Sequence, residues 1–392
     1  MSFFKIPISA VPVRFMDILK TGTETDLAGL KQILLSDASG AELFFLNSGA
    51  AGFYTALCVL KEITGKTEVV LPAYTAGSLI VAIEKAGLKP VLCDISLADF
   101  NMDPTGIDTL INDRTMAIVM VHMFGIVQSG ILDVRGKYPD ICVLEDCAQA
   151  MGSSIDGIPV GSMGDISFYS FNKGKNIPAV SGGCVRINSD KYKNEFQRII
   201  QRDFSGVLRK RSTLLLRIKM FALSIVVNRY IYGAVSDFLA GFRDMTPPGD
   251  IEVKSFSRYQ AAVALSLLHR QEQFSSIRSE NGRRIAQMLH DDDGIICPVL
   301  LADTVSAFNR YPVLFKDVNR MEKVRRALLK AGFETSRMYF KPLHRMFPEL
   351  DILSGRLPNS EYLAEHLLVL PCHPMVKEKD IYNMGNVIIS TT

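Results

Sequence analysis

From about residue 41 the chain alternates short apolar runs with longer stretches whose apolar residues recur at helical spacing. The apolar runs, each of strand length, are at 41–49, 67–74, 89–95, 115–125 and 141–152, and the clearest helical stretches are at 50–65 and 76–87. Short strands that alternate with helices are typical of βαβ units. The pattern therefore predicts a mainly parallel sheet that helices cover on both faces.

The C-terminal third has a different pattern. Helical periodicity extends over 257–289 and returns at 319–335, and an apolar strand at 306–315 lies between them. A chain of 392 residues is also long for a single core, which favours two domains. We therefore predict a large α/β domain over 1–250, with the sheet sandwiched between helices, and a smaller α+β domain over 251–392.

Composition narrows the class of protein. With 48% hydrophobic and 22% charged residues the chain is globular, and a net charge of +3 is too small to indicate a nucleic-acid partner. The seven cysteines include no CxxC pair, which argues against a disulfide framework and for a reducing cytoplasm. The N-terminus has no signal-peptide pattern, and no apolar run approaches the roughly 18 to 20 residues that span a bilayer. We expect a cytoplasmic protein.

Small residues follow the first predicted strand. In open α/β sheets, ligands bind beyond the carboxyl ends of the strands, so residues at these positions are candidates for a site. Ser48, Gly49 and Ala50 stand at a strand-to-helix turn, where backbone N–H groups can bind a phosphate. The same residues also suit a plain tight turn.

Ionisable residues follow two further strands. Glu145 and Asp146 come directly after an apolar run, and a carboxylate there needs a cationic or protonated partner because an unpaired buried charge is costly. A helix N-cap is the other interpretation of Asp146. His122 ends another strand, and on its own it indicates a hydrogen-bonded core histidine rather than a catalyst.

The fourth strand end lies in "DISFYSFNKGKNIPAVSGG", residues 165–183, where Ser170 precedes Lys173 and Lys175. One interpretation is a solvated turn, and the other is a nucleophilic amine. A lysine, a carboxylate, a serine and an anion-binding helix start at one sheet edge suit pyridoxal phosphate (PLP). The lysine would bind the cofactor covalently, the aspartate would keep the pyridine nitrogen protonated, and the helix start would hold the phosphate.

Other chemistries fit these residues less well. The His and Cys residues show no metal-ligand spacing, so we expect no metal site. The sequence has no GxSxG elbow for a hydrolase, no P-loop and no GxGxxG dinucleotide motif.

Eight segments, in order along most of the chain, resemble motifs of the DegT/DnrJ/EryC1/StrS family of PLP-dependent sugar aminotransferases. Each motif alone is weak, but their order makes the resemblance specific. The segments are "NSGAAGFYTAL", "LPAYTAGS", "VHMFG", "LEDCAQAMGS", "SFNKGKN", "SRYQAAVALSLL", "KPLHRM" and "LVLPCHP".

The resemblance implies PLP-transferase fold type I and a role for each matching residue. The family lysine falls on Lys175, whereas Lys173 occupies a variable position. Asp146 would pair with the pyridine nitrogen and Gln149 with the ring hydroxyl. The other cofactor contacts would come from Ala148 on the ring face and from Ser48, Gly49, Ala50 and Ser170 around the phosphate.

Several positions depart from the family pattern. Val180 and Ser181 stand where the family has the first Gly and the Glu of Gly-Glu-Gly-Gly, and Ala50 replaces the threonine of its SGT turn. Ala76 replaces an aromatic residue that stacks on the cofactor, which leaves Tyr74 as the substitute. These departures bear on cofactor affinity and substrate class more than on the fold.

The resemblance implies an enzyme that transfers an amino group, from glutamate, to a nucleotide-linked keto sugar in polysaccharide or glycoconjugate biosynthesis. It also implies a homodimer that completes each site, although the asparagine expected from the partner subunit is Val253 here. Sugar dehydratases of the same family carry histidine at the lysine position, so Lys175 argues against that activity. A non-catalytic relative that binds a sugar nucleotide or a partner protein is a third interpretation.

Residues 207–243 form a basic and apolar segment where family members have a shorter, more polar stretch. Three cations precede a run in which apolar residues recur at helical spacing: Arg209, Lys210 and Arg211, then Leu214, Ile218, Phe221 and Ile225. A basic start followed by an amphipathic helix suits peripheral contact with an anionic membrane. The alternative is that the segment packs against the enzyme itself or against its dimer mate.

Overall fold

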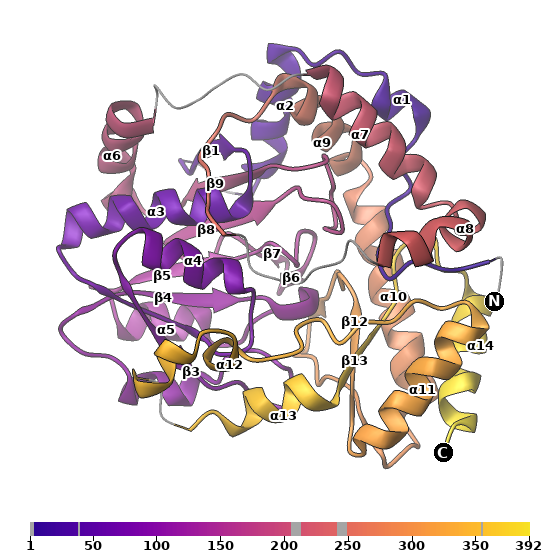
Figure 1. The fold of residues 1–392 in the computed structure, drawn as a ribbon. Helices are drawn as coiled ribbons and strands as arrows, with labels where there is room; N and C mark the ends of the chain where they lie inside the picture. The colour runs from indigo at the N-terminus through magenta and orange to yellow at the C-terminus, as the bar shows by residue number, and fades with distance from the viewer. Residues whose placement is uncertain (1–3, 38–39, 205–212, 241–248, 354–355) are drawn as a thin grey trace.

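The computed structural model describes residues 4–37, 40–204, 213–240, 249–353 and 356–392. Its centre is a seven-stranded sheet in the order β1-β9-β8-β5-β4-β2-β3 (Figure 1). The strands are β1 (Glu42–Leu46), β2 (Glu68–Pro72), β3 (Lys89–Cys93), β4 (Thr115–Val121), β5 (Cys142–Asp146), β8 (Ile166–Ser170) and β9 (Gly183–Ile187). Only β9 runs antiparallel to its neighbours, so the predicted mainly parallel sheet is confirmed.

Helices cover both faces of this sheet, as the apolar runs predicted. Alternate residues of β2 belong to different cores: Val69 packs with α3 (Gly49–Thr64) and α4 (Gly77–Lys85). Val70, on the other face, packs with helices that include α2 (Glu24–Leu34), α5 (Ile131–Lys137) and α9 (Arg258–Leu268). Strands that are buried on both sides have no polar face, which explains why they appear in the sequence as continuous apolar runs.

The C-terminal part has its own antiparallel sheet, in the order β10-β12-β13. Its main elements are α10 (Gln271–Leu289), β10 (Ile295–Ile296), β12 (Tyr311–Phe315), α11 (Val318–Ala331), β13 (Leu367–Leu370) and α14 (Glu378–Ser390). The remaining elements are α1 (Phe15–Ile18), η1 (Pro104–Thr109), η2 (Met123–Gly125), β6 (Ser154–Ile155), β7 (Ile158–Pro159), α6 (Asp190–Ile199), η3 (Ile200–Phe204), α7 (Thr213–Val226), α8 (Arg229–Ala240), β11 (Thr304–Val305), α12 (Leu343–Met346), η5 (Pro348–Leu353) and α13 (Pro358–His366).

The long helix predicted over 257–289 is two helices, α9 and α10, with a break at Arg270. The guanidinium of Arg270 pairs with Asp17 (2.5 Å) and donates to the carbonyl of Pro12 (2.9 Å). The break lets α9 pack against α2 while α10 packs against α14. Residues near the N-terminus also join the C-terminal part, since the N–H of Ile6 donates to the carbonyl of Gly332. The division of the chain at residue 250 stays a prediction.

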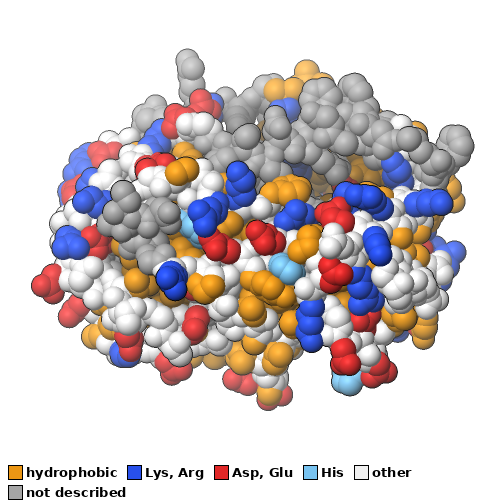
Figure 2. Space-filling view, turned by 60° about the horizontal axis from the view of Figure 1, so that its bottom comes forward, with side chains coloured by type: hydrophobic (Ala, Val, Ile, Leu, Met, Phe, Trp, Pro, Cys, Tyr) orange, Lys and Arg blue, Asp and Glu red, His pale blue; other side chains and the backbone are white. Residues whose placement is uncertain are grey.

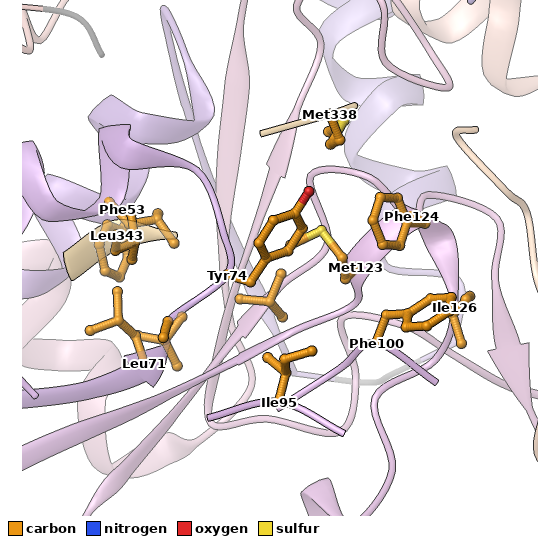
Figure 3. Packing of buried hydrophobic residues seen from close by; sticks show 14 of the residues in the cluster. Phe53, Leu71, Tyr74, Ile95, Phe100, Met123, Phe124, Ile126, Met338 and Leu343 are labelled. Carbon is orange, nitrogen blue, oxygen red and sulfur yellow. The ribbon is translucent and has the colours of Figure 1, made fainter. Parts of the chain in front are cut away.

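The apolar core continues from the large sheet into the C-terminal part. Tyr74, at the end of β2, is completely buried, and it lies between Met123 and Met338 (Figure 3). Its hydroxyl is 3.1 Å from the carbonyl of Arg337 and accepts the N–H of Tyr339 at 3.2 Å. Tyr74 therefore links the large sheet to the segment that follows α11.

The surface carries both signs of charge. Lys and Arg are interspersed with Asp and Glu across the face in Figure 2, and no single-sign field dominates it. This distribution accords with the small net charge of +3. Among the described residues, no helix is both long and apolar enough to cross a membrane. The basic and apolar segment lies partly outside these residues, at 207–212 and 241–243.

One glycine sets how closely the sheet approaches α3. A Cβ on Gly183, the first residue of β9, would lie 2.4 Å from the backbone N of Gly49 and 2.6 Å from the carbonyl O of Tyr169. Side chains do not fit at such distances, so only glycine allows the start of α3 to lie against β9.

We expect Gly183→Ala to lower the free energy of unfolding by about 1–3 kcal/mol, because the added methyl group overpacks the contact between backbones. The control is Gly136→Ala in α5, where nothing lies within 4 Å of the added Cβ. There the loss of backbone freedom in the unfolded chain should raise stability by about 0.5–1 kcal/mol. Urea denaturation of both variants measures the two effects, and equal shifts would contradict this account.

Candidate active site

Three strands of the large sheet bring the predicted residues to one edge. Because β1, β8 and β5 run in the same direction, their carboxyl ends meet there. These ends carry Ser48, Ser170 and Asp146. The loop with Lys175 leaves the same edge from β8.

The start of α3 and the side chain of Ser170 lie close together. Ser48 is the N-cap of α3, and its Oγ accepts the N–H of Ala51 at 3.0 Å. Other N–H groups of a first helical turn have no partner within the helix and attract anions. A Cβ on Gly49 would lie 3.1 Å from the Cβ of Ser170, which places that buried hydroxyl beside the helix start. The helix start and this hydroxyl can together bind a phosphate.

Asp146 is buried and has a polar environment of its own. Its Oδ1 accepts the N–H of Ala148 at 2.8 Å, and the methyl group of Ala148 is partly exposed. Burial raises the pKa of the Asp146 carboxyl, although the Ala148 N–H and the charge of Lys175 oppose this shift. Residues 147–153 form turns rather than a helix, so the N-cap interpretation of Asp146 is wrong.

The two lysines of the segment 165–183, Lys173 and Lys175, differ in environment. Lys173 is exposed, whereas Lys175 is partly buried. Burial lowers the pKa of Lys175 to about 8; the negative charge of Asp146 opposes this shift and the positive charge of Arg310 adds to it. An amine with such a pKa is partly neutral near pH 7–8 and can act as a nucleophile or a base.

Two asparagines hold the lysine loop in place, and sequence reasoning assigned a role to neither. The side-chain amide of Asn176 donates to the carbonyls of Met151 (3.1 Å) and Ala307 (2.7 Å). Asn309 donates to the carbonyl of Gly174 (2.8 Å) and to Oδ1 of Asn176 (3.1 Å). The available signal for Asn176 was its place directly after the lysine. Asn309 is far away in the sequence and gave none.

Gln149 has an unused acceptor. Its Oε1 is buried and has no hydrogen-bond partner in the described part of the chain, while its Nε2 lies 3.4 Å from Sδ of Met123. Tyr339, which the sequence analysis also missed, adjoins Gln149 and Asp146; burial and the charge of Asp146 raise the pKa of its hydroxyl. A ligand hydroxyl could satisfy the Gln149 oxygen.

Tyr74, the aromatic residue expected to stack on the cofactor, lies inside the protein core. Tyr74 is fully buried, and its ring meets that of Tyr339 edge to face, with 5.4 Å between centroids. Ala76, at the family's aromatic position, is the N-cap of α4. The stacking role of Tyr74 stays a prediction. Tyr339 is a second aromatic side chain at this place, in contact with Tyr74.

The remaining departures from the family pattern have local explanations. Val180 has φ of 70°, a conformation that favours glycine, which the family carries there. Ser181 accepts two contacts from Nε2 of Gln260, at 2.5 and 3.1 Å, which tie the loop to α9. Val253, at the asparagine position, is buried in this chain's own core.

A second polar cluster lies behind the edge and consists of His122, Glu145 and Cys147, whose ligand atoms are all within 4.8 Å of one another. Nδ1 of His122 accepts the N–H of Gln128 (3.0 Å), so Nε2 carries the hydrogen and donates to Glu145 (2.9 Å). Glu145 also accepts N–H groups of Gly161, Met163 and Gly164. The interaction with His122, together with the N–H groups of Gly161 and Gly164, outweighs burial and lowers the pKa of Glu145. Both histidine nitrogens are thus engaged, and the cluster fixes the 161–164 loop.

Comparisons with known proteins agree with this arrangement. The sequence profile of the DegT/DnrJ/EryC1/StrS aminotransferase family matches residues 42–216 and 254–388. A UDP-N-acetyl-3-dehydro-alpha-D-glucosamine 3-aminotransferase of Acidithiobacillus ferrooxidans is 26% identical over 94% of this chain and 87% of its own length.

Solved structures share the fold. The sugar aminotransferase CalS13 of Micromonospora echinospora has a TM-score of 0.76 at 22% identity, covering 99% of this chain and 100% of its own. Spr1654 of Streptococcus pneumoniae, solved in a PMP form, has a TM-score of 0.74 at 20% identity, covering 99% and 98%. The expected aminotransferase fold is therefore confirmed. With the profile matching most of its length, the chain belongs to the DegT/DnrJ/EryC1/StrS aminotransferase family.

Proposed function

We propose that this sugar aminotransferase uses PLP, held at the edge formed by β1, β8 and β5, to transfer an amino group to a nucleotide-linked keto sugar in polysaccharide or glycoconjugate biosynthesis. The observation that carries the proposal is the meeting of a partly buried amine, Lys175, and the buried carboxylate of Asp146 at the sheet edge where Ser170 and the start of α3 also lie; burial lowers the pKa of the amine to about 8. Two similar proteins support it. The enzyme of Acidithiobacillus ferrooxidans is named for a UDP-linked dehydro sugar, and the structure of Spr1654 was solved in a PMP form.

The residues at the edge fit PLP in three respects. The start of α3, together with the hydroxyl of Ser170, suits a phosphate. The buried Asp146 carboxylate, with its raised pKa, would be stabilised by a protonated ring nitrogen. The unpartnered Oε1 of Gln149 would accept the ring hydroxyl.

In this proposal each side chain has a distinct task. Bound PLP supplies an electron sink for the proton shift. Lys175 would hold the cofactor and would carry a proton as general base and acid; a pKa near the working pH favours both roles. Asp146 keeps the ring nitrogen protonated. The methyl group of Ala148 would pack against one face of the ring.

We further propose that Arg310 recognises a carboxylate of the amino donor, which favours an amino acid such as glutamate. Its guanidinium lies near the lysine loop, with one nitrogen 3.7 Å from a Cβ built on Gly174, and its charge lowers the pKa of Lys175. Nη1 donates to Oδ1 of Asn309 at 3.0 Å, which orients the group. A guanidinium that is positioned this way suits bidentate binding of a carboxylate.

We also propose a cytoplasmic homodimer. All seven cysteines are free, which supports a reducing compartment. The proposal of a dimer rests on the family resemblance. Position 253 cannot supply an asparagine to the partner's site, because it is a valine here, and Val253 is buried in its own chain.

Borohydride reduction of the PLP-loaded protein should place a pyridoxyl group on Lys175 and not on Lys173, because Lys175 has a depressed pKa beside Asp146, whereas the side chain of Lys173 is exposed to solvent. Peptide mass mapping identifies the labelled residue. Lys173→Ala is the matched control and should keep the label. A label on Lys173, or on neither lysine, would refute the assignment.

Asp146→Asn should leave the fold intact and slow transamination by several orders of magnitude, because a neutral amide cannot hold the proton on the ring nitrogen. Single-turnover kinetics with PLP-loaded protein, together with a thermal melt, separate this effect from a loss of stability. Turnover near that of the wild type would show that Asp146 does not pair with the ring.

The rate at which PLP binds covalently to the apo-protein should rise with pH around a midpoint near 8, since the Lys175 amine is charged below its pKa and nucleophilic above it. Asp146→Asn should move this midpoint down, because the carboxylate raises the pKa of Lys175. Arg310→Met should move it up by removing a cation. Stopped-flow absorbance across pH 6–10 measures the midpoints. A wild-type midpoint near the ordinary lysine value of 10.5 would contradict the site geometry.

A further inference from the structure

Helix α7 is apolar on two opposite sides. One side packs on the protein, where Leu216 and Met220 are buried in the core that contains α2 and α9. The other side is exposed to solvent: Leu214 is 69% exposed and Ile218 is 57% exposed. A helix with apolar side chains on two opposite sides normally has both sides covered. Within the described part of the chain nothing covers the outer side of α7, so that side needs a partner.

Helix α1 extends this apolar surface. It contacts α7, and Arg217 of α7 donates to the carbonyl of Lys20 at the end of α1 (3.2 Å). Phe15 and Met16 are 62% and 67% exposed. Figure 1 shows α1, α7 and α8 on one side of the molecule. The α1–α7 surface is defined by the exposed side chains of Phe15, Met16, Leu19, Leu214, Leu215, Ile218 and Phe221.

Most charges around this surface are positive. Residues 213–228 include Arg217 and Lys219 and no acidic residue, whereas Arg229, the first residue of α8, is paired with Asp380. On α1 the cations Arg14 and Lys20 are exposed, whereas the single acid, Asp17, is buried and paired with Arg270.

Two acidic side chains lie close by in the sequence. Glu24, the first residue of α2, is paired with Arg258. Asp26 accepts the N–H and hydroxyl of Thr23 in the helix cap and keeps its negative charge, so it offsets one of the four cations Arg14, Lys20, Arg217 and Lys219 and the border stays net positive. Exposed apolar side chains with a cationic border match a layer of apolar chains under anionic head groups.

We infer that the α1–α7 surface binds the interface of an anionic membrane. A second copy of the chain fits less well, because a two-fold symmetric contact would bring the cationic border against itself. Helix α7 has 14 residues and two internal cations, Arg217 and Lys219, so it suits a position in the plane of the interface rather than across the bilayer. This inference is independent of the proposed function.

The test is co-sedimentation of the full chain, loaded with PLP, with phosphatidylcholine vesicles and with vesicles that also contain phosphatidylglycerol. We expect binding to the anionic vesicles at low salt, weak binding to the neutral ones, and a loss of binding at about 0.5 M salt, where charge attraction is screened. If the protein stays in the supernatant with anionic vesicles at low salt, the inference is wrong.

Matched variants distinguish binding through the α1–α7 surface from non-specific adsorption of the protein to vesicles. Ile218→Gln/Phe221→Gln should lower partitioning onto anionic vesicles about tenfold or more, because two apolar side chains no longer enter the lipid. Lys219→Glu should lower it several-fold. The control Val299→Gln/Leu300→Gln replaces apolar residues that are 65% and 41% exposed elsewhere, and it should bind like the wild type.

Two further measurements decide the other outcomes. Sedimentation velocity without vesicles tests for a second copy on the surface: a change of oligomeric state in Ile218→Gln/Phe221→Gln, with lipid binding unaltered, would overturn the inference. A thermal melt checks folding; since both side chains are exposed, the melting temperature should not fall. If that variant melts early, Phe15→Gln/Met16→Gln on α1 replaces it, and normal lipid binding by this second variant would also refute the inference.

Discussion

An amine and a carboxylate, both withdrawn from water at the same edge of the sheet, are the pair on which the site depends. Burial favours the neutral form of each, so the pKa of Lys175 falls and that of Asp146 rises, while their mutual attraction opposes both shifts. The fold keeps this costly pair because each member stands on the end of a rigid strand or on a loop that is fixed from both sides. A cationic ring nitrogen next to Asp146 would relieve the cost.

The site is built by the large sheet but held by the C-terminal half. Asn309 bonds to Gly174 and Asn176, and so fixes the loop with Lys175 from across the sheet edge. Tyr74 in turn bonds to the backbone of Tyr339. A movement of the C-terminal half relative to the sheet would therefore alter the surroundings of Lys175 directly. Such coupling between parts is the physical basis of closure in many two-domain enzymes.

The sequence predicted the sheet and the strand ends well, because buried parallel strands appear as continuous apolar runs and ligands bind beyond their carboxyl ends. Ser48, Asp146 and Ser170 were found in this way. Asn309 and Tyr339 were not, since their contacts join residues more than a hundred positions apart and no local pattern marks them. The break at Arg270 also escaped prediction, because the carboxylate that pairs with this residue, Asp17, is far away in the sequence. The only sequence signal for the left-handed backbone conformation of Val180 was that the family has glycine at this position.

The pairing of the N-terminal residues with the segment after α11 constrains the order in which the chain can fold. Ile6 donates its N–H to Gly332, and Ile8 donates to the carboxylate of Glu334, 326 positions further on. Residues 6–8 leave the ribosome long before 332–334 exist. Residues 6–8 cannot form these hydrogen bonds until residues 332–334 have been synthesised, and contacts of such long range form slowly. The contacts of residues 6–8 with residues 332–334 are therefore among the last to form, and they join the N-terminal residues to the C-terminal part.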